Sequence, residues 1–283
     1  MSPDDAESCG FSPHTIGELR VAAEPRSTHA SCGPVQQNGS IDISLSSFDW
    51  PALFAPTAPV EITPAALLGI LAIAAALSIP RVTWQWFGLF TTLVHELGHA
   101  VAALLTGRAV HGIRIRSNHS GDALSSGRGT FGIVVSGMLG YPAPALVGAA
   151  QLWSVFTGYT AIALFLGGAM LVLTVLVIRN LFGVLVVLAA AAASALLWFY
   201  ATPNVQSYAL LVLGTALLVG SVRGLLTVIG VHLRRRDRLP TSDAYLLYRR
   251  TGVPSPVWLA LFAIVIGGCV VLAFSTYLAH FPA

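Results

Sequence analysis

A histidine, a glutamate and a second histidine stand at His95, Glu96 and His99, in the pattern HExxH. On a helix, residues four apart lie on one face, so the two imidazoles could hold the same metal ion. In zinc sites with this pattern, the histidines bind the metal and the glutamate acts on a metal-bound water. The sequence therefore predicts Zn²⁺ as the cofactor and Glu96 as the general base.

The apolar surroundings of this pattern strengthen the prediction. Residues 84–106 are mostly hydrophobic, and Glu96 is the only acidic residue among them. An ionisable side chain at membrane depth is costly and rare unless it has a function. The alternative is structural, with both histidines bonded to neighbouring helices and Glu96 protonated.

The composition of the chain predicts a polytopic membrane protein. Of its 283 residues, 55% are hydrophobic and only 10% are charged, whereas about a quarter of the residues in a soluble domain are charged. A membrane-crossing helix needs about 20 apolar residues, and six of the apolar runs meet this length. The runs lie at 64–79, 84–106, 130–151, 155–178, 181–201, 207–231 and 256–279. We expect an all-α fold with six to seven transmembrane helices, in which the first run is short for a full crossing.

The distribution of arginine predicts how the chain is oriented. With seven spans, thirteen of the fifteen arginines fall on the side of the N-terminus, Arg81 falls on the other side, and Arg223 lies within a span. Positively charged loops favour the cytoplasm. The sequence thus predicts a plasma-membrane protein with a cytoplasmic N-terminus and an extracytoplasmic C-terminus.

Two domains are expected. Residues 1–60 are polar, rich in Ser, Pro and Gly, and carry an excess of acidic side chains, which predicts a disordered cytoplasmic tail. Residues 61–283 form the integral-membrane domain. The basic excess of this domain is explained by anionic lipid, so the bilayer is an expected partner and nucleic acid is not. The oligomeric state is left open.

A small β-hairpin is expected after the helix that carries HExxH. Residues 110–116 alternate between apolar and polar side chains, which is a strand pattern. Residues 118–129 are rich in Gly and Ser, as in a turn, and 130–134 could be the returning strand. A plain polar loop is the alternative.

A third metal ligand must come from elsewhere in the chain, because a catalytic zinc usually has three protein ligands and a water. No glutamate follows Glu96, and the extended HExxHxxGxxH pattern fails because residue 105 is leucine. The remaining candidates are Asp122, Asp237, Asp243, His111, His119, His232 and His280.

Asp243 is the preferred ligand, ahead of His232 and Asp122, because it is expected on the same cytoplasmic side as His99. Its alternative role is to cap the helix that begins there. Asn180 is also expected on that side and is the candidate for a second catalytic residue that helps to stabilise an oxyanion.

The segment 95–100, His-Glu-Leu-Gly-His-Ala, lies in a hydrophobic helix before a possible hairpin and resembles the site-2 protease family of intramembrane zinc metalloproteases. The chain is more closely similar to the compact bacterial peptidase M50B-like branch. This similarity extends to 136–142 (SGMLGYP), 179–180 (RN), 242–244 (SDA) and Trp258. It covers roughly residues 64–279, and HExGH is its specific part.

The resemblance implies zinc, an aspartate as third ligand, and hydrolysis of peptide bonds within or near transmembrane segments of membrane protein substrates. Site-2 proteases usually supply that aspartate from an LDG motif in a later transmembrane helix, and this chain has no LDG. The assignment of Asp243 therefore rests on its position. Two other functions are weighed: a non-catalytic membrane scaffold that retains HExxH, and a metal-binding transporter. Against the transporter, the sequence has one polar intramembrane cluster and no visible repeat.

Overall fold

The structure is a computed structural model that describes residues 55–56 and 60–280, without the side chains of 236 and 237. The chain divides into two units, Met1–Phe48 and Asp49–Ala283, and only the second contains described residues. The prediction of a disordered tail over 1–60 therefore lies almost wholly outside the described residues.

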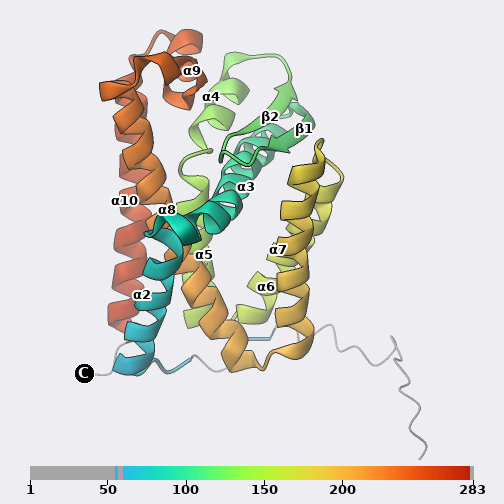
Figure 1. The fold of residues 1–283 in the computed structure, drawn as a ribbon, viewed down its shortest axis with the longest axis vertical. Coiled ribbons are helices and arrows are strands. Elements are labelled where there is room, and N and C mark those ends of the chain that lie inside the picture. The colour runs from blue at the N-terminus through green and yellow to red at the C-terminus, as the bar shows by residue number, and fades with distance from the viewer. Residues whose placement is uncertain (1–54, 57–59, 281–283) are drawn as a thin grey trace, which may run out of the picture. The chain divides into compact units, whose positions relative to one another are not determined.

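The described part is a helical bundle with one two-stranded sheet (Figure 1). Its α-helices are α2 (Pro64–Ser78), α3 (Arg81–Leu105), α4 (Thr130–Met138), α5 (Ala143–Phe156), α6 (Thr160–Val175), α7 (Leu181–Tyr200), α8 (Pro203–Arg234), α9 (Asp243–Thr251) and α10 (Ser255–Ala279). The 3-10 helix η2 (Arg236–Thr241) joins α8 to α9, and the strands are β1 (Ala109–Ile115) and β2 (Gly121–Ser126).

Five of these helices, α3, α6, α7, α8 and α10, are long and apolar enough to cross a membrane. The pair α4–α5 passes the same test as one span bent by 63°, with Pro142 just before α5. The all-α polytopic fold is confirmed, with five to six spans by length and composition among the described residues. The first expected run forms α2, whose 15 residues are too few for that test.

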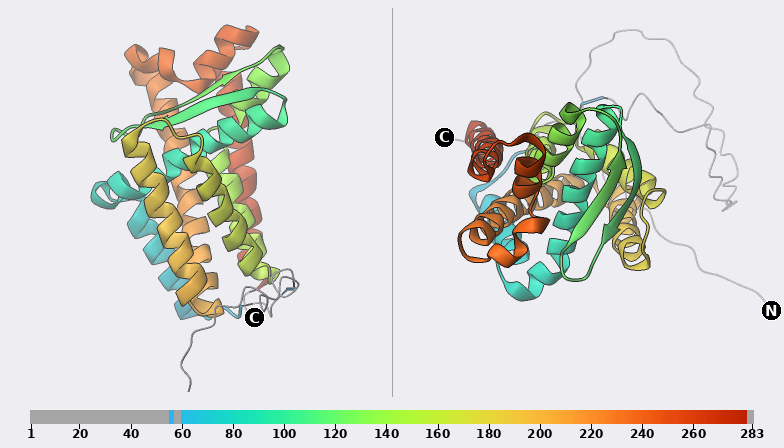
Figure 2. Two further views of the ribbon diagram at one scale, coloured as in Figure 1. Left: turned by 90° about the vertical axis from the view of Figure 1, so that its right-hand side faces the viewer. Right: turned by 90° about the horizontal axis from the view of Figure 1, so that it is seen from above.

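The helix α2 ends beside the middle of α8. The Ser78 hydroxyl donates to the carbonyl of Ala216 (3.0 Å), and Arg223 Nη1 donates to the carbonyls of Ser78 (2.6 Å) and Ile79 (2.8 Å). From Pro80 the chain continues as α3, which climbs obliquely to the end of the bundle that bears the sheet (Figures 1 and 2). Together α2 and α3 therefore carry the chain once from one end of the bundle to the other. The seven-span expectation had each of them cross separately.

The β-hairpin forms, but its second strand was placed wrongly. β1 pairs antiparallel with β2, which lies inside the stretch that was expected to be a turn. The expected returning strand, 130–134, is instead the first part of α4. Gly is disfavoured in strands and Ser is common in turns, and pairing with β1 overrides these tendencies. β1 also has a partner on its other edge, because Ile113 forms a parallel bridge with Ile178.

The main core lies where α5 and α8 pack together with α10 and α2. Its largest fully buried side chains include Leu152, Phe156, Leu211 and Phe262. A second cluster, with Leu93, Ile113, Ile115 and Val187 among its members, holds α3 and β1 against α6 and α7. The helix that carries HExxH is thus fixed by the sheet on one side and by α5 and α8 on the other.

Candidate metal centre

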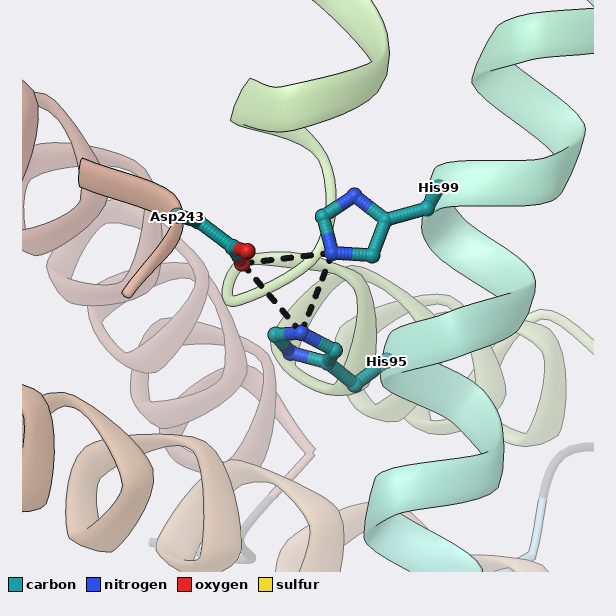
Figure 3. A group of neighbouring side chains, drawn as sticks. All are labelled: His95, His99 and Asp243. Carbon is teal, nitrogen blue, oxygen red and sulfur yellow. Dashed lines mark hydrogen bonds and ion pairs between the residues drawn. The ribbon is translucent and has the colours of Figure 1, made fainter. Parts of the chain in front are cut away.

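Three side chains from two distant parts of the chain meet between α3 and the start of α9 (Figure 3). His95 and His99 lie one turn apart on α3, and their Nε2 atoms are 3.1 Å apart. Asp243 is the first residue of α9, and its Oδ2 lies 3.3 Å from His95 Nε2 and 3.2 Å from His99 Nε2. All three side chains are largely buried.

The spacing of these three atoms fits a tetrahedral metal. Zinc binds His nitrogen and carboxylate oxygen at about 2.0–2.1 Å, so two of its tetrahedral ligands lie about 3.3–3.4 Å apart. The observed separations of 3.1–3.3 Å are close to that edge length. One ion could therefore contact all three atoms with little movement of the side chains.

Hydrogen bonding also indicates that a cation belongs among them. His99 Nδ1 lies 2.7 Å from the carbonyl oxygen of Ser136, which can only accept, so Nδ1 donates. In the neutral imidazole the His99 Nε2 lone pair then points toward Asp243 Oδ2, a buried oxygen without a hydrogen-bond donor. A proton on one imidazole would relieve a single contact, whereas a metal ion would satisfy all three atoms. The Ser136 carbonyl also fixes the His99 ring, as second-shell partners of metal ligands do.

Asp243 has the charge that a ligand needs. Burial alone would raise the pKa of its carboxyl, but the neighbouring His99 and His95 outweigh burial and hold that pKa below its usual range. Ser242 is the N-cap residue of α9, and the Asp243 side chain points toward the two histidines (Figure 3).

Glu96 lies beside the histidines and against the sheet. Only 4% of its surface is exposed. A Cβ on Gly121, the first residue of β2, would overlap the Glu96 carboxyl group, so the backbone of β2 comes directly against it. A buried carboxylate next to a metal-type cluster is placed to act as a general base.

The Peptidase M50B-like family model matches residues 68–273, which is more than half of the chain and includes the whole candidate centre. The chain belongs to the Peptidase M50B-like family. This confirms the resemblance inferred from the sequence, and the membrane-spanning helices agree with it. No curated protein and no solved structure matched the chain.

The M50B-like fold gives the other sequence candidates different partners. Asp122 pairs with Arg116, His111 contacts Ser126, His119 contacts the carbonyl of Gln85, His232 contacts that of Val228, and His280 contacts that of Thr276. Within the part of the chain that the structure describes, none of these five joins the cluster of His95, His99 and Asp243. The side chain of Asp237 lies outside the described residues.

The side chain of Asn180 is hydrogen-bonded to β1. Its Nδ2 donates to the carbonyl of Ile115 (2.7 Å), and its Oδ1 accepts from the Ile115 amide (3.1 Å). The side chain therefore pairs with β1 as a strand residue would, on the edge opposite β2. A role for Asn180 in stabilising an oxyanion stays a prediction.

Sequence reasoning missed two residues that shape this M50B-like centre. Gly140 lies so close to the histidines that a Cβ there would overlap both imidazoles. The Tyr141 ring meets His95 edge-on, with centroids 4.8 Å apart, and stacks on Phe262 of α10. Both residues lie in the segment 136–142, which carries part of the family resemblance. That resemblance was the signal in the sequence that could have identified them.

Proposed function

We propose that this protein is an intramembrane zinc metalloprotease that hydrolyses peptide bonds within or near transmembrane segments of membrane proteins. One observation carries the proposal: His95, His99 and Asp243 place three ligand atoms within 3.3 Å of one another beside the buried Glu96. Membership of the Peptidase M50B-like family supports peptidase chemistry at this cluster.

His95, His99 and Asp243 would hold the zinc ion, which when bound supplies a Lewis acid and lowers the pKa of water. Glu96 accepts the proton of the attacking water and passes it to the leaving amine. Gly121 has no side chain at the point where that carboxylate lies. Burial beneath the sheet keeps bulk water away from Glu96.

The hairpin offers an edge on which an unwound substrate could bind. β1 is covered on both edges, by β2 and by the segment around Ile178. β2 has no second strand partner among the described residues. A substrate strand added to β2 would pass Gly121 and therefore Glu96, and main-chain hydrogen bonds would hold it extended.

The positive-inside rule places the metal centre toward the cytoplasm. One end of the described bundle, the arginine-rich end, carries the hairpin, the α6–α7 connection and α9. It holds Arg108, Arg114, Arg116, Arg128, Arg179, Arg234, Arg235, Arg236, Arg238, Arg249 and Arg250. The connections at the opposite end, 157–159 and 201–202, hold none. Positively charged loops face the cytoplasm, so the C-terminal end of α10 faces outward.

This orientation revises the expectation for the N-terminal side. Figure 1 shows the start of α2 and the end of α10 at the same end of the bundle. Since α2 and α3 share one crossing, the residues just before α2 are also extracytoplasmic in this proposal. The cytoplasmic N-terminus expected from the sequence depended on two separate crossings.

Metal removal and restoration tests the proposed activity. The purified full chain is incubated with a transmembrane reporter substrate before chelation, after chelation, and after addition of Zn²⁺. Chelation should stop cleavage, and zinc should restore it. A protein that binds zinc stoichiometrically but cleaves none of a panel of transmembrane substrates would be the non-catalytic scaffold.

A further inference from the structure

Two arginines at the junction of α2 and α3 have no acidic partner among the described residues. The Arg223 guanidinium is held by the last carbonyls of α2, at Ser78 and Ile79, and lies 4.3 Å from the centroid of the Trp84 ring. Arg81, the first residue of α3, is exposed and makes no hydrogen bond or ion pair there. Arg81 follows Ile79, whose carbonyl accepts from Arg223, by two residues, so the two charges are near enough to interact. Two positive charges therefore lie together without a counter-charge from the part of the chain that the structure describes.

A recess of about 480 Å³ opens beside these charges, and we call it the α2–α8 recess. Its polar lining comes from Ser78, Arg223 and Thr227, and its apolar lining from Ile79, Val219, Val222 and Leu226. The recess therefore combines a fixed positive charge with an apolar wall. An anionic phospholipid has the complementary combination of a phosphate and acyl chains.

The recess extends from the middle of α8, where Ser78 bonds to Ala216, toward the arginine-rich end of that helix. Arg223 lies twenty residues after Pro203, the first residue of α8. At about 1.5 Å per residue this is about 30 Å, the thickness of the hydrocarbon core. The Trp84 ring beneath Arg223 also contacts His119 at the tip of the hairpin, with centroids 6.3 Å apart. The Arg223 end of the recess thus faces the polar surface layer.

We propose that the α2–α8 recess binds the phosphate of an anionic phospholipid from the leaflet on the arginine-rich side. Arg223 is held in place by the two α2 carbonyls and presents its remaining N–H groups to the phosphate. Arg81 approaches the phosphate from the start of α3, and guanidinium–phosphate pairs are charge-assisted and directional. An acyl chain covers Val219, Val222 and Leu226. The lipid thereby fills the recess beside the α2–α3 junction.

The experiment measures thermal unfolding of the purified full chain in detergent while phosphatidylglycerol is added. For the wild type we expect the midpoint temperature to rise with phosphatidylglycerol and to saturate, and to change little with phosphatidylcholine. Arg81→Gln should need about fivefold more phosphatidylglycerol for the same rise in midpoint temperature. A fivefold loss of affinity is what the removal of one arginine beside anionic lipid is expected to cause. Its zinc content should match that of the wild type, because Arg81 lies outside the metal cluster.

Arg128→Gln is the matched control, since Arg128 is also exposed and without a partner among the described residues but lies before α4. It should leave the response to phosphatidylglycerol unchanged. Equal responses of Arg81→Gln and Arg128→Gln would overturn the proposal, as would equal stabilisation by phosphatidylcholine or by inorganic phosphate alone. Arg223→Gln should abolish the response, but it also removes the bonds to α2, so the decision rests on Arg81.

Discussion

Asp243 Oδ2 lies 3.2 Å from His99 Nε2, although one residue begins α9 and the other belongs to α3. α9 is held in place through Ala244 and Leu247, which are buried, and Leu247 lies close to Gly137 of α4. The same α4 supplies the Ser136 carbonyl that orients His99. Packing of α9 on α4 therefore brings a carboxylate from outside the spanning helices to the histidines.

Loss of either histidine should abolish stoichiometric zinc. His95→Ala and His99→Ala each leave two ligands, and a catalytic zinc usually needs three. We expect metal analysis of both purified variants to show less than a tenth of the wild-type content. His111→Ala is the control, since His111 contacts Ser126 and lies outside the cluster. Full zinc content in both variants would remove the basis for the site.

Glu96→Gln should keep zinc and lose proteolysis. The amide has nearly the same shape as the carboxyl but cannot accept the proton, and loss of a general base typically costs about 10²–10⁴ in rate. The measurement is single-turnover cleavage of a transmembrane reporter substrate, with zinc content determined on the same sample. Wild-type rates in this variant would contradict the role proposed for Glu96.

Gly121→Ala should slow cleavage without removing the metal. The new methyl group would overlap the Glu96 carboxyl, so either that side chain or the start of β2 must move. We expect at least a tenfold lower rate, since displacing a catalytic group by about 1 Å can cost about 10²-fold. Gly69→Ala, in α2, is the control because a Cβ there meets nothing within 4 Å. If both variants cleave at the wild-type rate, β2 does not position Glu96.

Reporters placed before α2 and after α10 should give the same result. A reporter inserted before α2, at residue 60, and one fused after residue 283 should both be active only outside the cytoplasm, because α2 and α3 share one crossing. A reporter placed between Arg235 and Ser242 should be active only in the cytoplasm. Opposite results at the first two positions would restore the seven-span arrangement expected from the sequence.

Local patterns were enough to predict the helices and the two histidines. The spacing of His95 and His99 on an apolar helix is visible in the sequence, and so are the hydrophobic runs. Gly121 could not be identified, because its approach to Glu96 depends on how β2 pairs with β1, which is a contact between distant residues. The way α2 and α3 together run from one end of the bundle to the other was not predicted for a similar reason, since Arg223 of α8 holds the end of α2.

The comparison of Asp243→Ala with Asp243→Ser decides whether Asp243 is a ligand. Alanine and serine both lack a carboxylate, so a ligand role predicts that both variants lose zinc and cleavage. A capping role predicts that serine is tolerated and that alanine costs about 0.5–2 kcal/mol of stability. The structure favours the ligand role, because Ser242 already occupies the N-cap position of α9.

Thermal unfolding with and without chelator gives that comparison a second measurement. Zinc that binds only the folded protein raises its midpoint temperature, so chelation should lower the midpoint of the wild type. The midpoints of Asp243→Ala and Asp243→Ser should not respond to chelator, because neither variant holds the metal. Asp122→Ala should respond as the wild type does, since Asp122 pairs with Arg116 instead. A chelator-sensitive and active Asp243→Ser would show that zinc binding does not need the Asp243 carboxylate.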